Sequence, residues 1–252
     1  MSKYKRRIRN LYNSSIEGYK ISRTKIDLFV ECPRCFYLDR KLGFRRPSMP
    51  GWPLNSAVDH LLKKEFDLYR EKQERHPLMV EYDINALPFQ NEELPVWRDD
   101  VYRFVGASII DEKTGLQIQG IVDDIWVSPG NEIFIVDYKA TSTSSAISLD
   151  DEYKIRYKRQ MEIYQWIFRQ MGFRVSSLGY FVFANGIKEN ETFDRRLEFD
   201  LMILSYLGDD SWVGPTIIEI KNVLDSDQIP ASGADCEYCE YRRLVGQEEN
   251  LN

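Results

Sequence analysis

Two C-x-x-C pairs near opposite ends of the chain constrain its fold more than any other feature of the sequence. They are Cys32-Pro-Arg-Cys35 and Cys236-Glu-Tyr-Cys239. In a reducing compartment such pairs are metal or cluster ligands more often than disulfides. A zinc ribbon separates its two pairs by about 15–20 residues, whereas residues 36–235 intervene here. If the pairs meet, they join the two ends of the domain.

The chemistry of four thiolates leaves the bound group open. A 4Fe–4S cluster takes four cysteine ligands, and a zinc ion accepts the same set. Unligated buried thiols are the least expected alternative, because two such pairs would then occur by chance. Since each pair supplies two thiolates on a tight turn, we expect all four cysteines to bind one centre together.

Composition excludes several classes of protein. The chain has 252 residues, of which 43% are hydrophobic and 13% aromatic, and this excludes a disordered polymer. No apolar run approaches the roughly 18–20 residues of a membrane span, and the basic N-terminus lacks the apolar segment of a secretory signal. We therefore expect a cytoplasmic protein with no membrane partner. The net charge of −6 does not suggest a general nucleic-acid binder, although basic side chains gather locally over 154–159.

The hydrophobic pattern predicts a mixed α/β protein, with a flexible basic arm over 1–20 and a single domain over 21–252. Helices are expected over 22–30, capped by Ser22, and over 33–42. Strands are expected over 107–111, 116–127 and 133–139. After these strands we expect a helix over 151–171 capped by Asp150, strands over 175–184 and 196–207, a helix over 215–224 and a short helix after Cys239. We also expect a long amphipathic helix after Gly51, with an apolar side formed by Ala57, Val58, Leu61, Leu62 and Phe66.

Acidic and basic side chains interrupt two apolar strands. Asp137 and Lys139 share one face of the strand over 133–139, because residues two apart in a strand point the same way. Asp123 and Asp124 lie inside the preceding strand. Burying lone charges costs several kcal/mol, so these acids need a metal, a partner or water. Two carboxylates can hold Mg²⁺ beside the lysine ammonium. The alternative is a salt bridge between Lys139 and either acid.

This arrangement resembles the signature of the PD-(D/E)XK nucleases. Asp123 is followed, after thirteen residues, by Asp137-Tyr138-Lys139, and residues 120–123 resemble the G-x-x-D strand of that family. Three further features resemble the RecB-like branch, which includes the CRISPR-associated iron–sulfur exonucleases. They are His60 in the helix after Gly51, a Q-x-x-x-Y motif at Gln160 and Tyr164, and cysteines at both ends. The resemblance covers about residues 22–245.

The sequence also departs from that branch. The usual members have one N-terminal and three C-terminal cysteines, whereas this chain has two and two, so zinc remains an alternative to the cluster. Val122 stands where the family name has proline. For His60 the ordinary alternative is a histidine on the helix surface or at the edge of the core that makes one hydrogen bond. For Gln160 it is a hydrogen-bonded core residue, and for the basic segment 154–159 it is a solvated helix face.

The resemblance implies a restriction-endonuclease-like mixed β-sheet flanked by helices, with a cysteine site joining the terminal segments. It implies Mg²⁺ or Mn²⁺ bound by Asp123 and Asp137, with His60 and the backbone carbonyl of Tyr138 as further ligands. Lys139 would orient or activate the attacking water. Gln160 and Tyr164 would position the DNA strand. A 4Fe–4S cluster is the favoured group at the four cysteines, with zinc as the alternative.

The implied activity is cleavage from an end of single-stranded DNA, in repair, recombination or CRISPR spacer processing. The expected partners are DNA and proteins of repair or CRISPR adaptation. Two alternatives stay open. One is a non-catalytic nucleic-acid-binding module of a larger complex. The other is a sequence-specific endonuclease, for which the sequence shows no recognition element.

Overall fold

The computed structural model describes residues 5–47, 51–99 and 105–249, and its packing divides the chain into two compact units. The described parts of Met1–Pro50, Ile110–Ile118 and Ser211–Asn252 form the first unit. Those of Gly51–Ile109 and Gln119–Asp210 form the second. Together they contain two mixed sheets and flanking helices, which confirms the predicted α/β class. A single domain over 21–252 stays a prediction.

The second unit is built on a five-stranded sheet of order β2-β5-β6-β7-β8. Its strands are β2 (Leu87–Pro88), β5 (Asp124–Val127), β6 (Ile133–Thr141), β7 (Leu178–Gly186) and β8 (Phe199–Leu207). Neighbouring strands are antiparallel except β6 and β7, which are parallel. A 3₁₀ turn over Glu152–Lys154 and helix α6 (Ile155–Gln170) connect these two parallel strands. Such a crossover is the usual way to join parallel strands.

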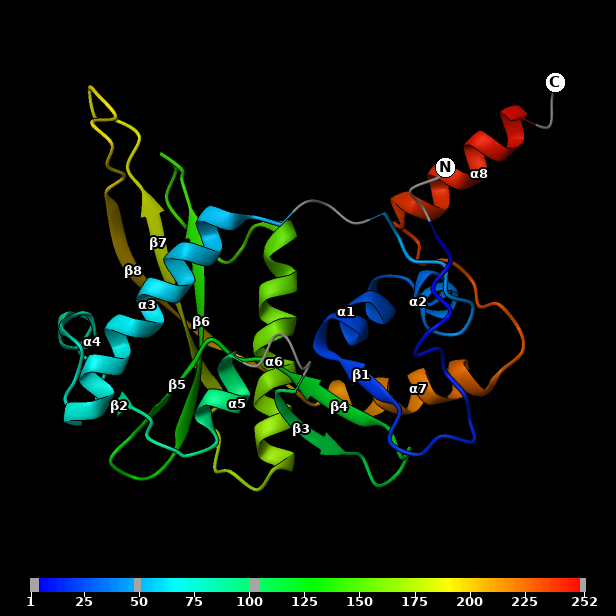
Figure 1. The fold of residues 1–252 in the computed structure, drawn as a ribbon, viewed down its shortest axis with the longest axis horizontal. Coiled ribbons are helices and arrows are strands. Elements are labelled where there is room, and N and C mark those ends of the chain that lie inside the picture. Colours follow the sequence, from blue (N-terminus) through cyan, green and yellow to red (C-terminus); the bar gives the residue numbers. More distant parts are fainter. Residues whose placement is uncertain (1–4, 48–50, 100–104, 250–252) are drawn as a thin grey trace. The chain divides into compact units, whose positions relative to one another are not determined.

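Two helices cover opposite faces of this sheet (Figure 1). Helix α3 (Pro53–Lys72) buries Val58, Leu62 and Phe66 against the face that carries Val136 and Tyr138. Helix α6 lies on the other face, where Gln160 reaches Asp137. Because side chains alternate along a strand, β6 turns Val136 and Tyr138 toward α3, and its other face, toward α6, carries Asp137 and Lys139 together with the buried Ile133 and Ile135.

The apolar side of α3 is narrower than the sequence suggested. Leu61 is 63% exposed and Ala57 is also exposed, although both were expected in the apolar stripe. The buried positions 58, 62 and 66 are four residues apart and form one line along the helix. Positions 57 and 61 lie about 100° around the helix from that line, so they face solvent.

The predicted strand over 116–127 is in fact two strands in different sheets. β4 (Gln117–Gly120) belongs to a three-stranded sheet of order β1-β4-β3, with β1 (Lys20–Ser22) and β3 (Ala107–Ile110), whereas β5 belongs to the larger sheet. Between them, the Val122 N–H donates to the carbonyl of Trp97 at 3.1 Å instead of to a neighbouring strand. The apolar alternation continues through this break, so it hid the change of sheet.

The first unit contains helices α1 (Arg23–Glu31), α2 (Pro33–Arg40), α7 (Val213–Asp225) and α8 (Glu237–Glu249). The last helix begins before Cys239 rather than after it. Ser22 does precede α1, but its side chain makes no capping hydrogen bond. Residues 1–4 of the expected basic arm lie outside the described part of the chain. Farther along the arm, Arg7 N–H donates to Gly43 and Tyr12 N–H to Arg40, each at 2.8 Å.

Other boundaries also differ from the expectation. The helix expected over 151–171 starts with its 3₁₀ turn, and Lys154 rather than Asp150 precedes the α-helical part. The segment 76–99, to which no helix or strand was assigned from the sequence, contains α4 (Pro77–Glu81), β2 and α5 (Leu94–Asp99). Among the described residues, no helix is both long and apolar enough to cross a membrane.

Candidate active site and cysteine centre

Asp137 lies at the centre of a charged group that also contains Asp123 and Lys139. Its carboxylate is fully buried, with Oδ2 in contact with the Lys139 ammonium and Oδ1 accepting a hydrogen bond of 2.6 Å from Gln160 Nε2. Burial raises the pKa of Asp137 to about 7. The Lys139 charge opposes this rise, and the nearby Asp123 carboxylate adds to it. The second unit therefore holds a carboxyl group that an additional cation would stabilise as the anion.

Asp123 lies just before β5 and reaches across to β6. Its Oδ2 accepts the backbone N–H of Tyr138 at 2.9 Å, and that amide lies between Asp137 and Lys139 in the sequence. The Asp123 side chain is 21% exposed, whereas that of Asp137 is 0% exposed. The structure thus brings Asp123, Asp137 and Lys139 together, as the spacing of the motif predicted, and leaves Asp123 accessible from solvent.

Lys139 is held as an ammonium. Burial alone would lower the pKa of Lys139, but the charges of Asp137 and Asp123 more than offset burial and raise it. The ring of Tyr157 lies 4.6 Å from Lys139 Nζ, which adds a cation–π contact. A protonated lysine donates hydrogen bonds and accepts none. In this state Lys139 can orient an oxygen atom or stabilise negative charge, but it cannot take up a proton.

Gln160 and Tyr164 support the acids from α6. Gln160 Nε2 donates a hydrogen bond to Asp137. The same nitrogen lies 3.4 Å from the hydroxyl of Tyr164, which is one helical turn away. Tyr164 packs over Gly120, where an added Cβ would lie only 2.5 Å from the Tyr164 ring. The Gly of the G-x-x-D strand and the Tyr of Q-x-x-x-Y are therefore in contact. A role for either α6 residue in positioning DNA stays a prediction.

His60 is exposed on α3, whereas its neighbour Asp59 forms an ion pair with Lys63, which also lies near Asp123. Lys63 Nζ lies 3.0 Å from Asp59 Oδ2 and 3.7 Å from Asp123 Oδ1. In the part of the chain that the structure describes, the four cysteines form the one close group of three or more His, Cys, Asp or Glu ligands. His60 is thus not gathered with Asp123 and Asp137, and its metal role stays a prediction.

Asp124 has a different environment from its neighbour Asp123. It is fully buried in contact with Arg70, and its Oδ2 accepts a hydrogen bond of 2.7 Å from the Tyr138 hydroxyl. Arg98 lies 3.9 Å from Asp124 Oδ1. Burial raises the pKa of Asp124, and the two arginines oppose that rise. This network connects α3 and α5 to the sheet, so Asp124 serves folding while Asp123 faces the charged group.

The sequence interpretation missed Lys63, Asp59, Arg70 and Arg98. For the first two a signal exists, because an acid and a lysine four residues apart lie beside the buried line of α3. The arginines gave no such signal. Arg70 and Arg98 meet Asp124 from 54 and 26 positions away in the sequence, and only the packing of α3 and α5 on the sheet brings them there.

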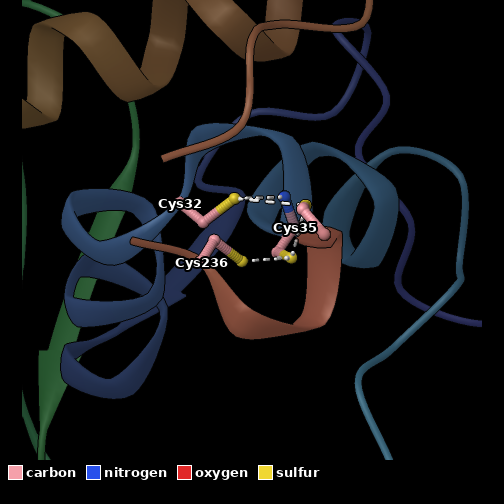
Figure 2. A group of neighbouring side chains, drawn as sticks. Cys32, Cys35 and Cys236 are labelled. Atoms are coloured by element: carbon pink, nitrogen blue, oxygen red, sulfur yellow. Dashed lines mark hydrogen bonds between the residues drawn. The ribbon is translucent and has the colours of Figure 1, made fainter. Parts of the chain in front are cut away.

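The four cysteines meet within the first unit, as the sequence predicted, and could hold a metal. Their sulfur atoms all lie within 4.8 Å of one another. Figure 2 shows Cys32, Cys35 and Cys236 with their side chains gathered together. The Sγ–Sγ distance is 3.7 Å for Cys32 and Cys239, 3.6 Å for Cys35 and Cys236, and 3.7 Å for Cys35 and Cys239. None is in a disulfide. Burial raises the pKa of Cys32, but hydrogen bonds from the Gly233 and Cys35 N–H groups outweigh it and lower the value to about 7.

A family comparison agrees with the motif geometry around Asp123, Asp137 and Lys139. A sequence model of the PD-(D/E)XK nuclease superfamily matches residues 52–244, which is more than half of the chain. The crystal structure of SSO0001 aligns at 15% identity over 89% of this chain and 84% of that chain, with a TM-score of 0.33. No curated protein matches the chain. The family match includes all residues of the charged group and the second cysteine pair, and it begins after the first pair.

Proposed function

The chain belongs to the PD-(D/E)XK nuclease superfamily, and from this premise we propose that it is a metal-dependent nuclease that hydrolyses phosphodiester bonds of DNA. The observation that carries the proposal is the contact between the two halves of the motif. Asp123 accepts the Tyr138 N–H, and this places its carboxylate beside Asp137 and Lys139. A salt bridge alone would leave unexplained why two acids converge on one lysine in a buried place.

The residues of this site fit a hard divalent cation. Asp137 Oδ2 contacts the Lys139 ammonium, and the nearby Asp123 charge raises the pKa of Asp137. Asp123 lies next to it and is partly exposed. Carboxylate oxygens suit Mg²⁺ or Mn²⁺, so Asp123 and Asp137 would hold the ion. Such an ion supplies charge that neutralises the attacked phosphate and makes water more acidic.

The protein groups around the ion have separate roles in this proposal. Gln160 donates to Asp137 Oδ1 and thereby fixes the orientation of that carboxylate. Lys139 remains protonated and donates a hydrogen bond to the attacking water or to a phosphate oxygen. His60 and the Tyr138 carbonyl are the further ligands that the resemblance implies. Asp59 is an additional candidate, because Lys63 connects it to Asp123.

For the substrate we propose single-stranded DNA with a free end, in repair, recombination or CRISPR spacer processing. The order of motifs on α3, β5, β6 and α6 supports this choice. The start of α6 also supports it, because Arg156 is exposed there and Lys158 is partly exposed. These two residues flank Tyr157, whose ring contacts Lys139. Cations there can bind phosphates. Lys154 is less suited, because it is buried against Asp151 and the Ser148 carbonyl.

The experiment that tests this proposal compares end-labelled linear with circular single-stranded DNA. We expect Mg²⁺ or Mn²⁺ to support degradation of the linear strand, EDTA to abolish it, and the circle to stay intact. Cleavage of the circle would favour the endonuclease alternative. Binding of both DNAs without any metal-dependent cleavage would overturn the enzymatic proposal and favour the non-catalytic binding module.

A further inference from the structure

We propose that the four cysteines bind one zinc ion in a tetrahedral site, and not the 4Fe–4S cluster that the resemblance implies. The proposal rests on the spacing of the four sulfur atoms and on the backbone that fixes this spacing. It concerns the first unit alone and does not depend on the nuclease proposal.

The sulfur spacing matches a single small ion. In a regular tetrahedron with zinc–sulfur bonds of about 2.3 Å, neighbouring sulfurs lie about 3.8 Å apart. Three of the sulfur pairs lie 3.6, 3.7 and 3.7 Å apart, and no pair is farther apart than 4.8 Å. All four ligands come from the protein, which is the pattern of structural zinc rather than of catalytic zinc.

A cubane cluster needs a wider opening. Each of its four thiolates binds a different iron at a corner of the cube, so the thiolate sulfurs stand roughly 6 Å apart. The largest separation here, 4.8 Å at most, is well below that value. To accept a cluster, the two cysteine turns would have to move apart.

The local backbone opposes such a movement. Gly233 lies against the end of α1, where an added Cβ would be 2.1 Å from the Glu31 carbonyl oxygen. From this position the Gly233 N–H donates to Cys32 Sγ at 3.3 Å, and the Cys35 N–H donates to the same sulfur at 3.4 Å. Gly233 therefore joins the two chain segments beside the sulfurs, and separating these segments would break its hydrogen bond to Cys32 Sγ.

The surroundings also stabilise the charge of the proposed site. Four thiolates around Zn²⁺ carry a net charge of −2. Arg46 Nη2 lies 3.2 Å from Cys236 Sγ, and the same guanidinium stacks at 4.5 Å on the Tyr238 ring and pairs with Glu31 at 2.5 Å. Hydrogen bonds from N–H groups to metal-bound thiolates are a usual outer shell of such sites. Arg46 is thus a positioned counter-charge.

The test is metal analysis of the full chain, purified without oxygen from cells supplied with both iron and zinc. We expect one zinc per chain, a colourless protein and no acid-labile sulfide. Exchange for Co²⁺ should give the intense visible bands of tetrahedral thiolate coordination. Iron with acid-labile sulfide, a single iron without sulfide, or no metal with four freely titratable thiols would each overturn the proposal.

Variants add a control that does not depend on nuclease activity. Cys239→Ser should lower the zinc content, whereas Cys239→His should retain it, because imidazole is an ordinary zinc ligand. Ser232→Ala, an exposed neighbour of the second pair, should leave the zinc content unchanged. If Cys239→Ser fails to fold, the metal content and Co²⁺ spectrum of the wild type still decide the question.

Discussion

At the scale of single residues, the titration of the buried Asp137 carboxyl makes the stability of the fold depend on pH. Its pKa in the folded, metal-free protein is raised to about 7, whereas an unfolded aspartate titrates near pH ~4. The folded state therefore binds this proton more tightly, and the stability that the group contributes falls as pH rises from about 4 to about 7. A bound cation favours the carboxylate and removes this trend.

We accordingly predict that metal-free protein gains thermal stability when the pH is lowered from about 8 to about 6, relative to Asp137→Asn. Saturating Mn²⁺ should abolish the difference between the wild type and Asp137→Asn in how thermal stability changes with pH. Thermal denaturation of both proteins, with and without Mn²⁺, is the measurement. Parallel pH curves for the metal-free wild type and the variant would contradict the raised pKa.

Asp59 and His60 are adjacent residues of α3 with different surroundings. Lys63 connects Asp59 to Asp123, whereas His60 is exposed. We predict that Asp59→Asn weakens Mn²⁺ binding several-fold and that His60→Asn has the smaller effect. Calorimetric titration with Mn²⁺ measures both, and Asp123→Ala and Asp137→Ala should each lose binding. The reverse order for the two α3 variants would make His60 the ligand.

At the scale of elements, the contact between Gly120 on β4 and Tyr164 on α6 can be tested directly. A methyl group at position 120 would lie 2.5 Å from a buried aromatic ring. We predict that Gly120→Ala destabilises the protein by about 1–3 kcal/mol and slows cleavage, because Tyr164 also supports Gln160. Denaturant unfolding measures the first effect.

Two variants serve as controls for that prediction. Gly51→Ala should be nearly neutral, since an added Cβ there has no atom of the described residues within 4 Å, its chain neighbours aside. Combining Gly120→Ala with Tyr164→Leu should restore part of the stability, because the smaller side chain leaves room for the methyl group. Equal unfolding free energies for Gly120→Ala and the wild type would show that the ring can move aside at no cost.

The elements also show which structural features the sequence could predict. The strand over 133–139 and the convergence of Asp123, Asp137 and Lys139 followed from a period of two and a short turn, which are local properties. The break near 121–123 could not be predicted, because apolar residues continue through it while the chain changes sheets. The Arg70–Asp124–Arg98 network depends on helix packing, which leaves no mark in a local pattern.

At the scale of the whole molecule, the cysteine centre closes a long loop of chain. The two pairs are about 200 residues apart in sequence, and a covalent cross-link over that distance would remove unfolded-chain entropy worth on the order of 4–5 kcal/mol. Their meeting was predictable from the spacing of the cysteines. The nature of the bound group was not, because it depends on sulfur–sulfur distances of a few ångström.

We predict that loss of any one cysteine, or removal of the metal with a strong chelator, lowers the melting temperature and exposes both terminal segments to proteolysis. Nuclease activity at low temperature should change only indirectly, since no cysteine belongs to the Asp and Lys group. Limited proteolysis followed by mass spectrometry locates the cuts. Unchanged melting and cleavage patterns in Cys32→Ser and Cys236→Ser would show that the centre does not restrain the chain ends.

Single-turnover cleavage of end-labelled single-stranded DNA by Lys139→Ala tests the central claim most directly. Lys139 contacts the buried carboxylate of Asp137, and the charge of Asp123 acts on both groups. We predict a loss of at least about 100-fold in rate, with DNA binding retained and with Lys64→Ala, an exposed lysine of α3, as active as the wild type. Wild-type turnover by a folded Lys139→Ala protein would contradict the account.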